Sequence, residues 1–352
     1  MTDGSTWWRS TSMRNKTITL ALQGGGSHGA FTWGVLDRLL EEPRLGIEGI
    51  SGASAGAMNA VVLAHGYTRG GRDGARLALK RFWDAVATRE PLTAIPDNPF
   101  APDGGGALGS DNPLRAFLFM TRYFSPYQLN PLDVNPLRDI LEDQVDFEGL
   151  RTDCPIALFI AATRVSTGTL RIFGTRQITL EALLASACLP ALHHSIKIDG
   201  EAYWDGGLTA NPPLYPLLAG CSADDLLMVL LHGEPLATIP ATADEIARRL
   251  TEIGFTAGFF AEIQGLFLAK QEAERGWGAI GRLQRKLRRL HLHLIDAPKY
   301  MSTLGVLSKA NTHASFIAAL YEEGRRRTDL WLAANLQRVG VASSCEPSDV
   351  LR

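Results

Sequence analysis

The chain has 352 residues, of which 45% are hydrophobic and 20% are charged, and its formal net charge is −2. This length and composition supply a large core and allow about two domains, and they lack the basic excess that indicates a nucleic-acid partner. The four cysteines are scattered without a C-x-x-C pair, so the sequence indicates neither a zinc site nor a disulfide framework.

The N-terminal residues 1–16 contain no apolar run of the kind found in signal peptides, and we expect a short disordered arm. No window offers ~18 uninterrupted apolar residues. The nearest stretch, residues 254–269, is interrupted by Glu262 and Gln264. The expected location is therefore the cytoplasm, with peripheral contact with a membrane or lipid surface left open.

The first predicted elements alternate between strand and helix. Short apolar runs at residues 17–23 and 45–51 predict buried strands, and helical spacing of apolar residues follows at 29–42 and 55–66. A strand–helix–strand unit places its two strands parallel and adjacent. A third helix is expected over residues 73–90.

The segment from Pro91 to Pro136 differs in character, because prolines, glycines and aromatic residues are dense there. It predicts an irregular excursion with one short helix near residues 113–123. Long loops in compact domains are commonly functional covers. The aromatic residues favour an ordered cover, which together with the apolar residues 255–268 could form a lid over an acyl chain.

The remaining chain continues the alternation. Strands are expected within residues 155–165, 170–174, 201–207, 225–233 and 290–296, and helices within 179–189, 243–289 and 308–336. His291 and His293 alternate with leucines, so this side of the last strand is expected to face solvent or neighbouring charges. The whole pattern predicts an α/β fold with a mainly parallel sheet.

A candidate nucleophile lies in "GISGASAG", which contains the G-x-S-x-G spacing of Gly52, Ser54 and Gly56. The motif stands between a predicted strand and a predicted helix, where a sharp turn exposes the serine oxygen. The alternative is a small-residue turn with a helix-capping serine.

The glycine run in "LALQGGGSHGAF" fits two kinds of site. Gly24, Gly26 and Gly29 satisfy G-x-G-x-x-G, which is the spacing of a dinucleotide site, but the second strand ends without the acidic residue that holds a ribose. A serine nucleophile instead needs backbone amides aimed at an oxyanion. Gly25 and Gly26 are the expected donors, with the Ala55 N–H as a third.

The serine also needs a base, and "AYWDGGLTANPP" offers Asp205 at the end of a strand. An Asp–Gly pair is also a common turn signal. His232 follows Ser54 and Asp205 in the order Ser…Asp…His, so a triad is formally available. His193 and His194 also lie near Asp205 in the sequence, although each is expected to be a packed or solvated side chain.

The three motifs "GGGSHG", "GASAG" and "DGG", in this order, resemble the patatin-like phospholipase family over residues 17–218. The resemblance implies a three-layer α/β/α fold with Ser54 as nucleophile and Asp205 as base. It also implies oxyanion donors in the loop from Gly24 to Gly29, and no metal or other cofactor. The remaining motif positions are Gly52, Gly56, Gly206 and Gly207. The chain would then comprise the arm 1–16, a catalytic domain 17–218, a strand and helix extension 219–340 packed on the core, and a tail 341–352.

Two positions depart from the family pattern, and the first is Gln23, which stands where many members have an acidic residue or glycine. His28 stands where the family usually places Arg or Lys before the last glycine of the loop. A histidine titrates near neutrality, so the sequence does not settle how strongly the loop is held or how far activity depends on pH.

The function expected from these features is hydrolysis of lipid carboxylic esters through a serine ester. The expected partner is a lipid substrate, and the basic run "RLQRKLRRL" is either a solvated face or a contact for anionic headgroups. The alternatives are a catalytically silent lipid-binding protein, a Ser–Asp–His esterase and a dinucleotide-binding enzyme. The sequence does not choose the lipid class or the oligomeric state.

Overall fold

The computed structural model describes residues 16–88, 120–121, 123–276 and 281–351. In these ranges one sheet holds the strands in the order β5-β6-β3-β2-β1-β7-β8, and β4 pairs with β3 beside this path. The strands are β1 (Lys16–Leu22), β2 (Leu45–Gly52), β3 (Ala157–Arg164), β4 (Thr169–Gly174), β5 (Ile196–Ile198), β6 (Glu201–Asp205), β7 (Asp225–Val229) and β8 (His291–Ile295).

The centre of the sheet is parallel and one edge is antiparallel. The strands β3, β2, β1, β7 and β8 run parallel, whereas β4 and β6 run antiparallel to β3. The predicted parallel pairing of the first two strands is confirmed, with Leu22 opposite Gly52 at their carboxyl ends. The chain segments that follow β1 and β2 therefore begin side by side, at the carboxyl ends of the parallel strands.

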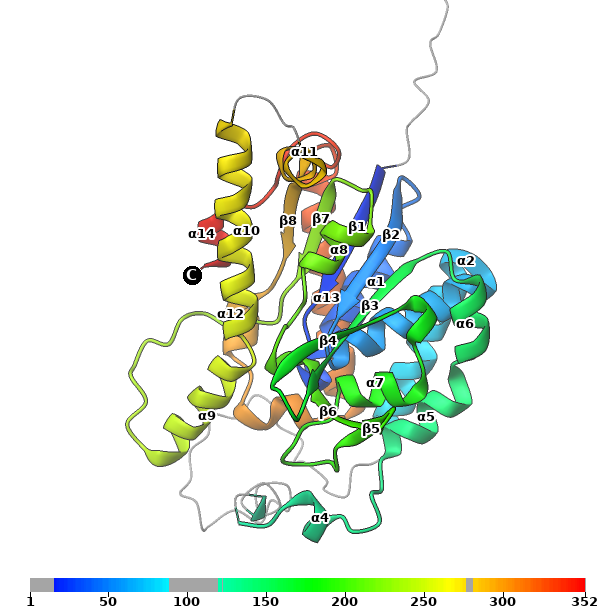
Figure 1. Ribbon diagram of the computed structural model, residues 1–352, viewed down its shortest axis with the longest axis vertical. Helices are drawn as coiled ribbons and strands as arrows, with labels where there is room; N and C mark the ends of the chain where they lie inside the picture. Colours follow the sequence, from blue (N-terminus) through cyan, green and yellow to red (C-terminus); the bar gives the residue numbers. More distant parts are fainter. Residues whose placement is uncertain (1–15, 89–119, 122, 277–280, 352) are drawn as a thin grey trace, which may run out of the picture.

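Helices cover both faces of the sheet, as Figure 1 shows. The helices are α1 (Gly29–Leu40), α2 (Ala55–Thr88), α4 (Pro126–Leu129), α5 (Pro136–Gln144), α6 (Phe147–Asp153), α7 (Leu180–Ser186), α8 (Tyr215–Gly220), α9 (Ala243–Gly254), α10 (Ala257–Arg275), α11 (Arg282–Arg289), α12 (Pro298–Ser302), α13 (Ala314–Asn335) and α14 (Pro347–Val350). The described 3₁₀ helices are η1 (Gly26–His28), η2 (Thr175–Gln177), η3 (Gly206–Leu208) and η4 (Val306–Ala310).

Two hydrophobic cores lie on opposite faces of the sheet, and alternate residues of β7 contribute to one or the other. Leu227 and Val229 belong to the core shared with α1, α2 and α13, whereas Leu226 and Met228 belong to the core shared with α8, α10 and α11. Because successive strand residues point to opposite faces, a run of apolar residues in a strand serves both layers. The chain therefore has the expected three-layer α/β/α fold.

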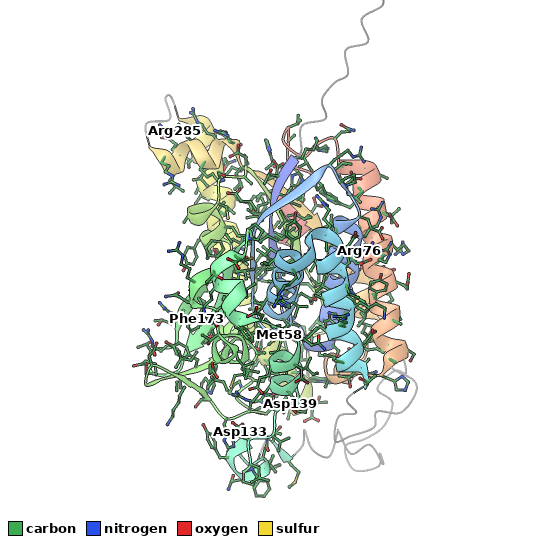
Figure 2. All side chains as sticks on the ribbon, turned by 90° about the vertical axis from the view of Figure 1, so that its right-hand side faces the viewer. Met58, Arg76, Asp133, Asp139, Phe173 and Arg285 are labelled. Atoms are coloured by element: carbon green, nitrogen blue, oxygen red, sulfur yellow. The ribbon has the colours of Figure 1, made fainter. Side chains whose placement is uncertain are left out.

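Helix α2 continues beyond the predicted end at Gly66. The backbone leaves helical geometry only at Gly70 and Gly71, where Gly71 has φ +59°. A Cβ on Gly66 would collide with the carbonyl oxygen of Gly74. The glycine at 66 therefore allows close approach of the second half of α2, and it does not end the helix. Figure 2 shows Met58 and Arg76 on the two halves.

Strand β8 is more deeply covered than the sequence predicts. His293 is completely buried, and its ring nitrogens are hydrogen-bonded to Asp225 at 2.9 Å and to Ser344 at 2.8 Å. The chain after α13 covers β8, since the Ser344 N–H donates to the carbonyl of Leu292 at 2.9 Å. His291 and His293 both lie beside the Asp225 carboxylate, so the expected neighbouring charge is present. The expected contact with solvent was wrong for His293, because alternation alone does not reveal this covering segment.

Several predictions lie outside the described residues. These are the disordered arm, apart from its last residue, and most of the predicted excursion, including nearly all of the helix at 113–123. The boundary at residue 218 also stays a prediction, and β7 and β8, which follow it, belong to the same sheet as β1. No helix in the described part of the chain is long and apolar enough to span a membrane.

Candidate active site

Ser54 stands on a sharp turn between β2 and α2. Its φ is +52°, a left-handed conformation that costs energy for a residue with a Cβ. The turn needs its flanking glycines: a Cβ on Gly52 would lie 2.6 Å from the carbonyl carbon of Gly56, and a Cβ on Gly56 would collide with the Leu22 oxygen. Ser54 is half-buried, so the turn holds a reachable hydroxyl at the amino end of a helix.

The end of α7 holds this turn in place. The Ser54 N–H donates to both the carbonyl oxygen and the Oγ of Ser186, each at 3.0 Å. Two residues later, the Cys188 carbonyl accepts the Asp205 N–H at 2.8 Å. One short segment therefore fixes the backbones of both predicted catalytic residues, a role that sequence reasoning missed for Ser186.

The sheet register brings Asp205 to the carboxyl ends of the parallel strands, where Ser54 also lies. Gly52 pairs with Ile160 on β3, and two residues further along β3, Ala162 pairs with Asp205 at the end of β6. A Cβ on Gly206 would collide with the Ala161 carbonyl, so only glycine fits directly after the aspartate.

The Asp205 carboxyl is completely buried and only partly satisfied. Its Oδ1 accepts the Gly207 N–H at 2.7 Å, and its Oδ2 has no hydrogen-bond partner within the described ranges. Burial raises the pKa of Asp205 to about 7, against the lowering effects of the Gly207 N–H and the Ser54 side chain. Ser54 is therefore a neighbour of the carboxyl, although Oδ2 accepts no hydrogen bond from it here.

The glycine loop lies against this turn. A Cβ on Gly24 would stand 2.7 Å from the Cβ of Ser54, and Gly26 has φ +58° with the Lys309 carbonyl packed against its Cα. The N–H groups of Gly25, Gly26 and Ala55 donate to no protein acceptor among the residues described. These three amides are therefore available to an anion beside Ser54.

Gly24 behaves differently from the other predicted donors. Its N–H donates to Oδ1 of Asn211 at 2.6 Å, so it is not available to an oxyanion. The same Asn211 donates through Nδ2 to the carbonyls of Gly24 and Phe255, each at 3.3 Å. Asn211 thus holds the glycine loop from the segment that follows Asp205. The sequence motif after "DGG" contained this residue, but nothing in it indicated a partner 187 positions away.

Replacing Asn211 with alanine is expected to destabilise the fold and to slow catalysis. The change leaves buried polar groups of Gly24 unpaired, which costs about 1–3 kcal/mol, measured by chemical denaturation. A loosened loop should also lower kcat for a soluble ester by about 10- to 100-fold. Asn335→Ala, at the end of α13, is the control. An unchanged kcat in the folded Asn211 variant would show that Asn211 does not position the loop.

His28 is buried, which the sequence did not indicate. Only 4% of it is exposed, and its Nε2 is hydrogen-bonded to Oγ of Ser308 at 2.7 Å. Burial, with a smaller contribution from the charge of Lys309, lowers the pKa of His28 to about 3. The imidazole is thus neutral at physiological pH, and the expected titration near neutrality was wrong, because η4 covers the ring.

The neutral histidine predicts a measurable pH dependence of stability. Below pH 6.5 the unfolded chain binds a proton that the folded chain accepts only near pH 3, so the free energy of unfolding falls with the pH in this window. Between pH 7 and pH 5, the wild-type chain should lose about 2 kcal/mol more than His28→Gln. Denaturant titrations at both pH values measure this difference. Equal losses would contradict the neutral, buried state.

Two of the other candidate histidines pack against aromatic rings. His232 packs against the rings of Phe259 and Phe260, with centroid distances of 5.8 and 5.2 Å. The His194 ring stacks on Tyr127 at 4.0 Å. Asp205 Oδ1 accepts a backbone N–H and not an imidazole N–H, so the arrangement does not favour the triad.

Two features that metal and dinucleotide sites need are missing at this end of the sheet in the described chain. No group of three or more His, Cys, Asp or Glu side chains is placed there to hold a metal ion. Strand β2 ends in Ser51 and Gly52, without a carboxylate for a ribose. A surface cavity of about 680 Å³ lies elsewhere, at the amino ends of the parallel strands, where Lys16, Asp225 and His291 line it.

Comparisons with known proteins identify the family of the chain. The model of the patatin-like phospholipase family matches residues 20–218, which is more than half of the chain. Among solved structures, VipD from Legionella pneumophila is similar at 15% identity and a TM-score of 0.42, covering 96% of this chain and 72% of that one. No curated protein matches the chain significantly. The family match is decisive: the chain belongs to the patatin-like phospholipase family, and it is a hydrolase that acts on lipids.

Proposed function

We propose that the chain cleaves carboxylic esters of phospholipids or related lipids through a Ser54–Asp205 dyad. The observation that carries this proposal is the pairing of a strained, reachable Ser54 with a completely buried carboxyl at the same edge of the sheet. Family membership supports lipid acyl hydrolysis in general. The assignment of Ser54 and Asp205 as its dyad is our proposal.

In the first half of the reaction, Asp205 accepts the Ser54 proton while the serine oxygen bonds to the ester carbonyl carbon. The carbonyl electron pair moves onto its oxygen, which becomes the oxyanion. When the carbonyl re-forms, the bond to the alcohol oxygen breaks and the alcohol leaves with the proton from Asp205. In the second half, Asp205 accepts a proton from water while the water oxygen attacks the acyl carbon. The bond between this carbon and Ser54 Oγ then breaks, Oγ takes the proton back from Asp205, and the fatty acid is released.

The raised pKa suits Asp205 to the role of base. An aspartate with its usual pKa of about 4 is a weak base toward a serine hydroxyl. Burial brings the pKa of Asp205 to about 7, which is close to the working pH where general bases are most effective. The unpaired Oδ2 is the atom that we assign to proton transfer.

The oxyanion is assigned to the N–H groups of Gly25, Gly26 and Ala55. Ala55 begins α2, and the glycine loop leads into α1 through η1, so two helix amino ends add partial positive charge at this position. Gly24 is left out as a donor because its N–H is bonded to Asn211.

An activity panel tests this function. Phosphatidylcholine, lysophosphatidylcholine, triacylglycerol and a short soluble ester are incubated with the wild-type chain, with Ser54→Ala as the blank. Release of fatty acid from at least one lipid, absent in the blank, supports the proposal. Lipid binding without any hydrolysis would instead establish the silent lipid-binding alternative.

A further inference from the structure

The exposed apolar side chains of this protein are concentrated in two segments. Among the described residues, 11 of the 17 exposed large hydrophobic side chains lie within residues 120–134 and 236–253. The most exposed are Ile239 at 91%, Leu132 at 84% and Tyr123 at 69%. We call the exposed apolar side chains of these two segments the apolar rim. Exposed apolar side chains that gather at one end of a molecule are candidates for an interaction surface.

Helix α9 forms the ordered part of the rim. Ile246, Leu250 and Ile253 recur at helical spacing on one face, and none of the 12 residues of α9 is buried. A capping box of Thr242 and Glu245 stabilises its first turn. The helix is therefore amphipathic, and its apolar residues remain exposed in the described chain.

The rim stands at the same end of the molecule as the catalytic pair. In Figure 1, α4 and α9 lie toward the lower end, where the carboxyl ends of β1 and β2 are, and Figure 2 places Asp133 at that end too. Phe255, directly after α9, packs on Gly207: a Cβ there would lie 2.7 Å from its ring. The Phe255 carbonyl also accepts the Asn211 side chain. The rim thus continues into the site.

The basic helix α11 is the other candidate lipid contact, and the structure disfavours it. Arg285 marks its position at the end opposite Asp133 in Figure 2. Lys286 is bonded to the carbonyl of Ser222 at 3.0 Å, and Arg289 pairs with Asp224. These cations are used within the chain and lie far from the site.

We propose that the apolar rim docks on a lipid surface and presents Ser54 to it. This inference rests on the proposed function, because a lipid substrate has to leave its membrane or droplet at the end where the catalytic pair stands. The apolar face of α9 fits the interfacial region, where such helices bury their apolar side. The helix carries two arginines against three acidic residues, so apolar insertion dominates over charge and a zwitterionic surface suffices.

The test measures binding and hydrolysis separately. Phosphatidylcholine vesicles are floated with the full chain carrying Ser54→Ala, with and without Ile246→Glu and Leu250→Glu. The two charges should weaken binding at least about tenfold, since each replaces an apolar side chain that would be buried in the lipid surface. Leu330→Glu on α13, where the leucine is 57% exposed, is the matched control.

Hydrolysis is measured with the chain that retains Ser54 and carries the same two glutamate substitutions. This measurement distinguishes the docking surface from the proposed catalytic function. Turnover on vesicles should fall at least about tenfold, while turnover on a soluble short-chain ester stays unchanged. Unchanged vesicle binding would overturn the docking surface. A wild-type dimer that the charges dissociate, detected by light scattering, would overturn it as well, in favour of a second copy. Vesicle binding that depends on the rim, without hydrolysis of any ester, would leave the surface standing and refute the proposed function.

Discussion

Ser54→Ala is expected to lower kcat for a soluble ester by about 10³-fold or more. Without the hydroxyl no serine ester forms, and the remaining amides can only stabilise direct attack by water. The fold should persist, because the Ser54 N–H, and not its side chain, bonds to Ser186. Initial rates with a short-chain ester, compared at equal amounts of folded protein, measure the effect.

The matched control is Ser166→Ala. Ser166 is exposed in the turn between β3 and β4, where its hydroxyl donates to Glu201 at 3.0 Å. Its removal should leave the rate within a factor of about two, because surface contacts of this kind contribute little. Full activity of the Ser54 variant, or loss of activity in the Ser166 variant, would direct the search for a nucleophile elsewhere.

Asp205→Asn is expected to lower kcat by about 10²- to 10⁴-fold, which is the range of general base catalysis. Asparagine keeps the Oδ1 that accepts the Gly207 N–H, but it cannot take up a proton. The control is Asp199→Asn in the turn between β5 and β6, where φ is +51° and asparagine is tolerated. If activity survives in Asp205→Asn and is lost in His232→Ala, the triad replaces the dyad.

The pH dependence gives a second signature of the same residue. For the wild-type chain kcat/KM should fall about tenfold per pH unit below pH 7, because protonated Asp205 cannot act as the base. The free energy of unfolding depends on pH in the opposite direction and decreases as the pH rises. The folded pKa lies above the unfolded value, so the folded chain holds the extra proton between about pH 4 and pH 7 and loses this advantage as the pH rises.

From pH 5 to pH 8 the wild-type chain should therefore lose about 2–3 kcal/mol more of its free energy of unfolding than Asp205→Asn. Denaturant titrations at the two pH values measure the difference. Parallel pH profiles for the two proteins would show that the carboxyl is not held in the buried, high-pKa state. Asp205 would thus lower stability at alkaline pH while it serves as the base, and such a loss of stability in exchange for activity is typical of active sites.

Local patterns in the sequence were sufficient to predict the central elements. Apolar runs followed by glycines located β1 and β2, and the strand–helix–strand rule fixed their parallel pairing. The motif "GASAG" placed Ser54 at the turn between β2 and α2. These predictions depend on neighbours within a few residues, which a single sequence displays directly.

The supporting residues depend on contacts that the sequence does not display. Ser186 bonds to a residue 132 positions away, and His28 bonds to Ser308 at a separation of 280. Small polar residues in loops carry no periodic signal, so Asn211 could not be told from an ordinary turn residue. The burial of His28 and His293 follows from chain segments that return late in the sequence, and the environment that raises the pKa of Asp205 is formed in the same way.

The central claim is that Ser54, Asp205 and the loop amides converge on one reacting carbonyl. A crystal structure of the wild-type chain after reaction with an alkyl fluorophosphonate tests it most directly. The account predicts phosphorus bonded to Ser54 Oγ, with the phosphoryl oxygen about 2.7–3.1 Å from the N–H nitrogens of Gly25 or Gly26 and Asp205 beside the adduct. A phosphonate on another residue, or a phosphoryl oxygen directed away from the glycine loop, would contradict it.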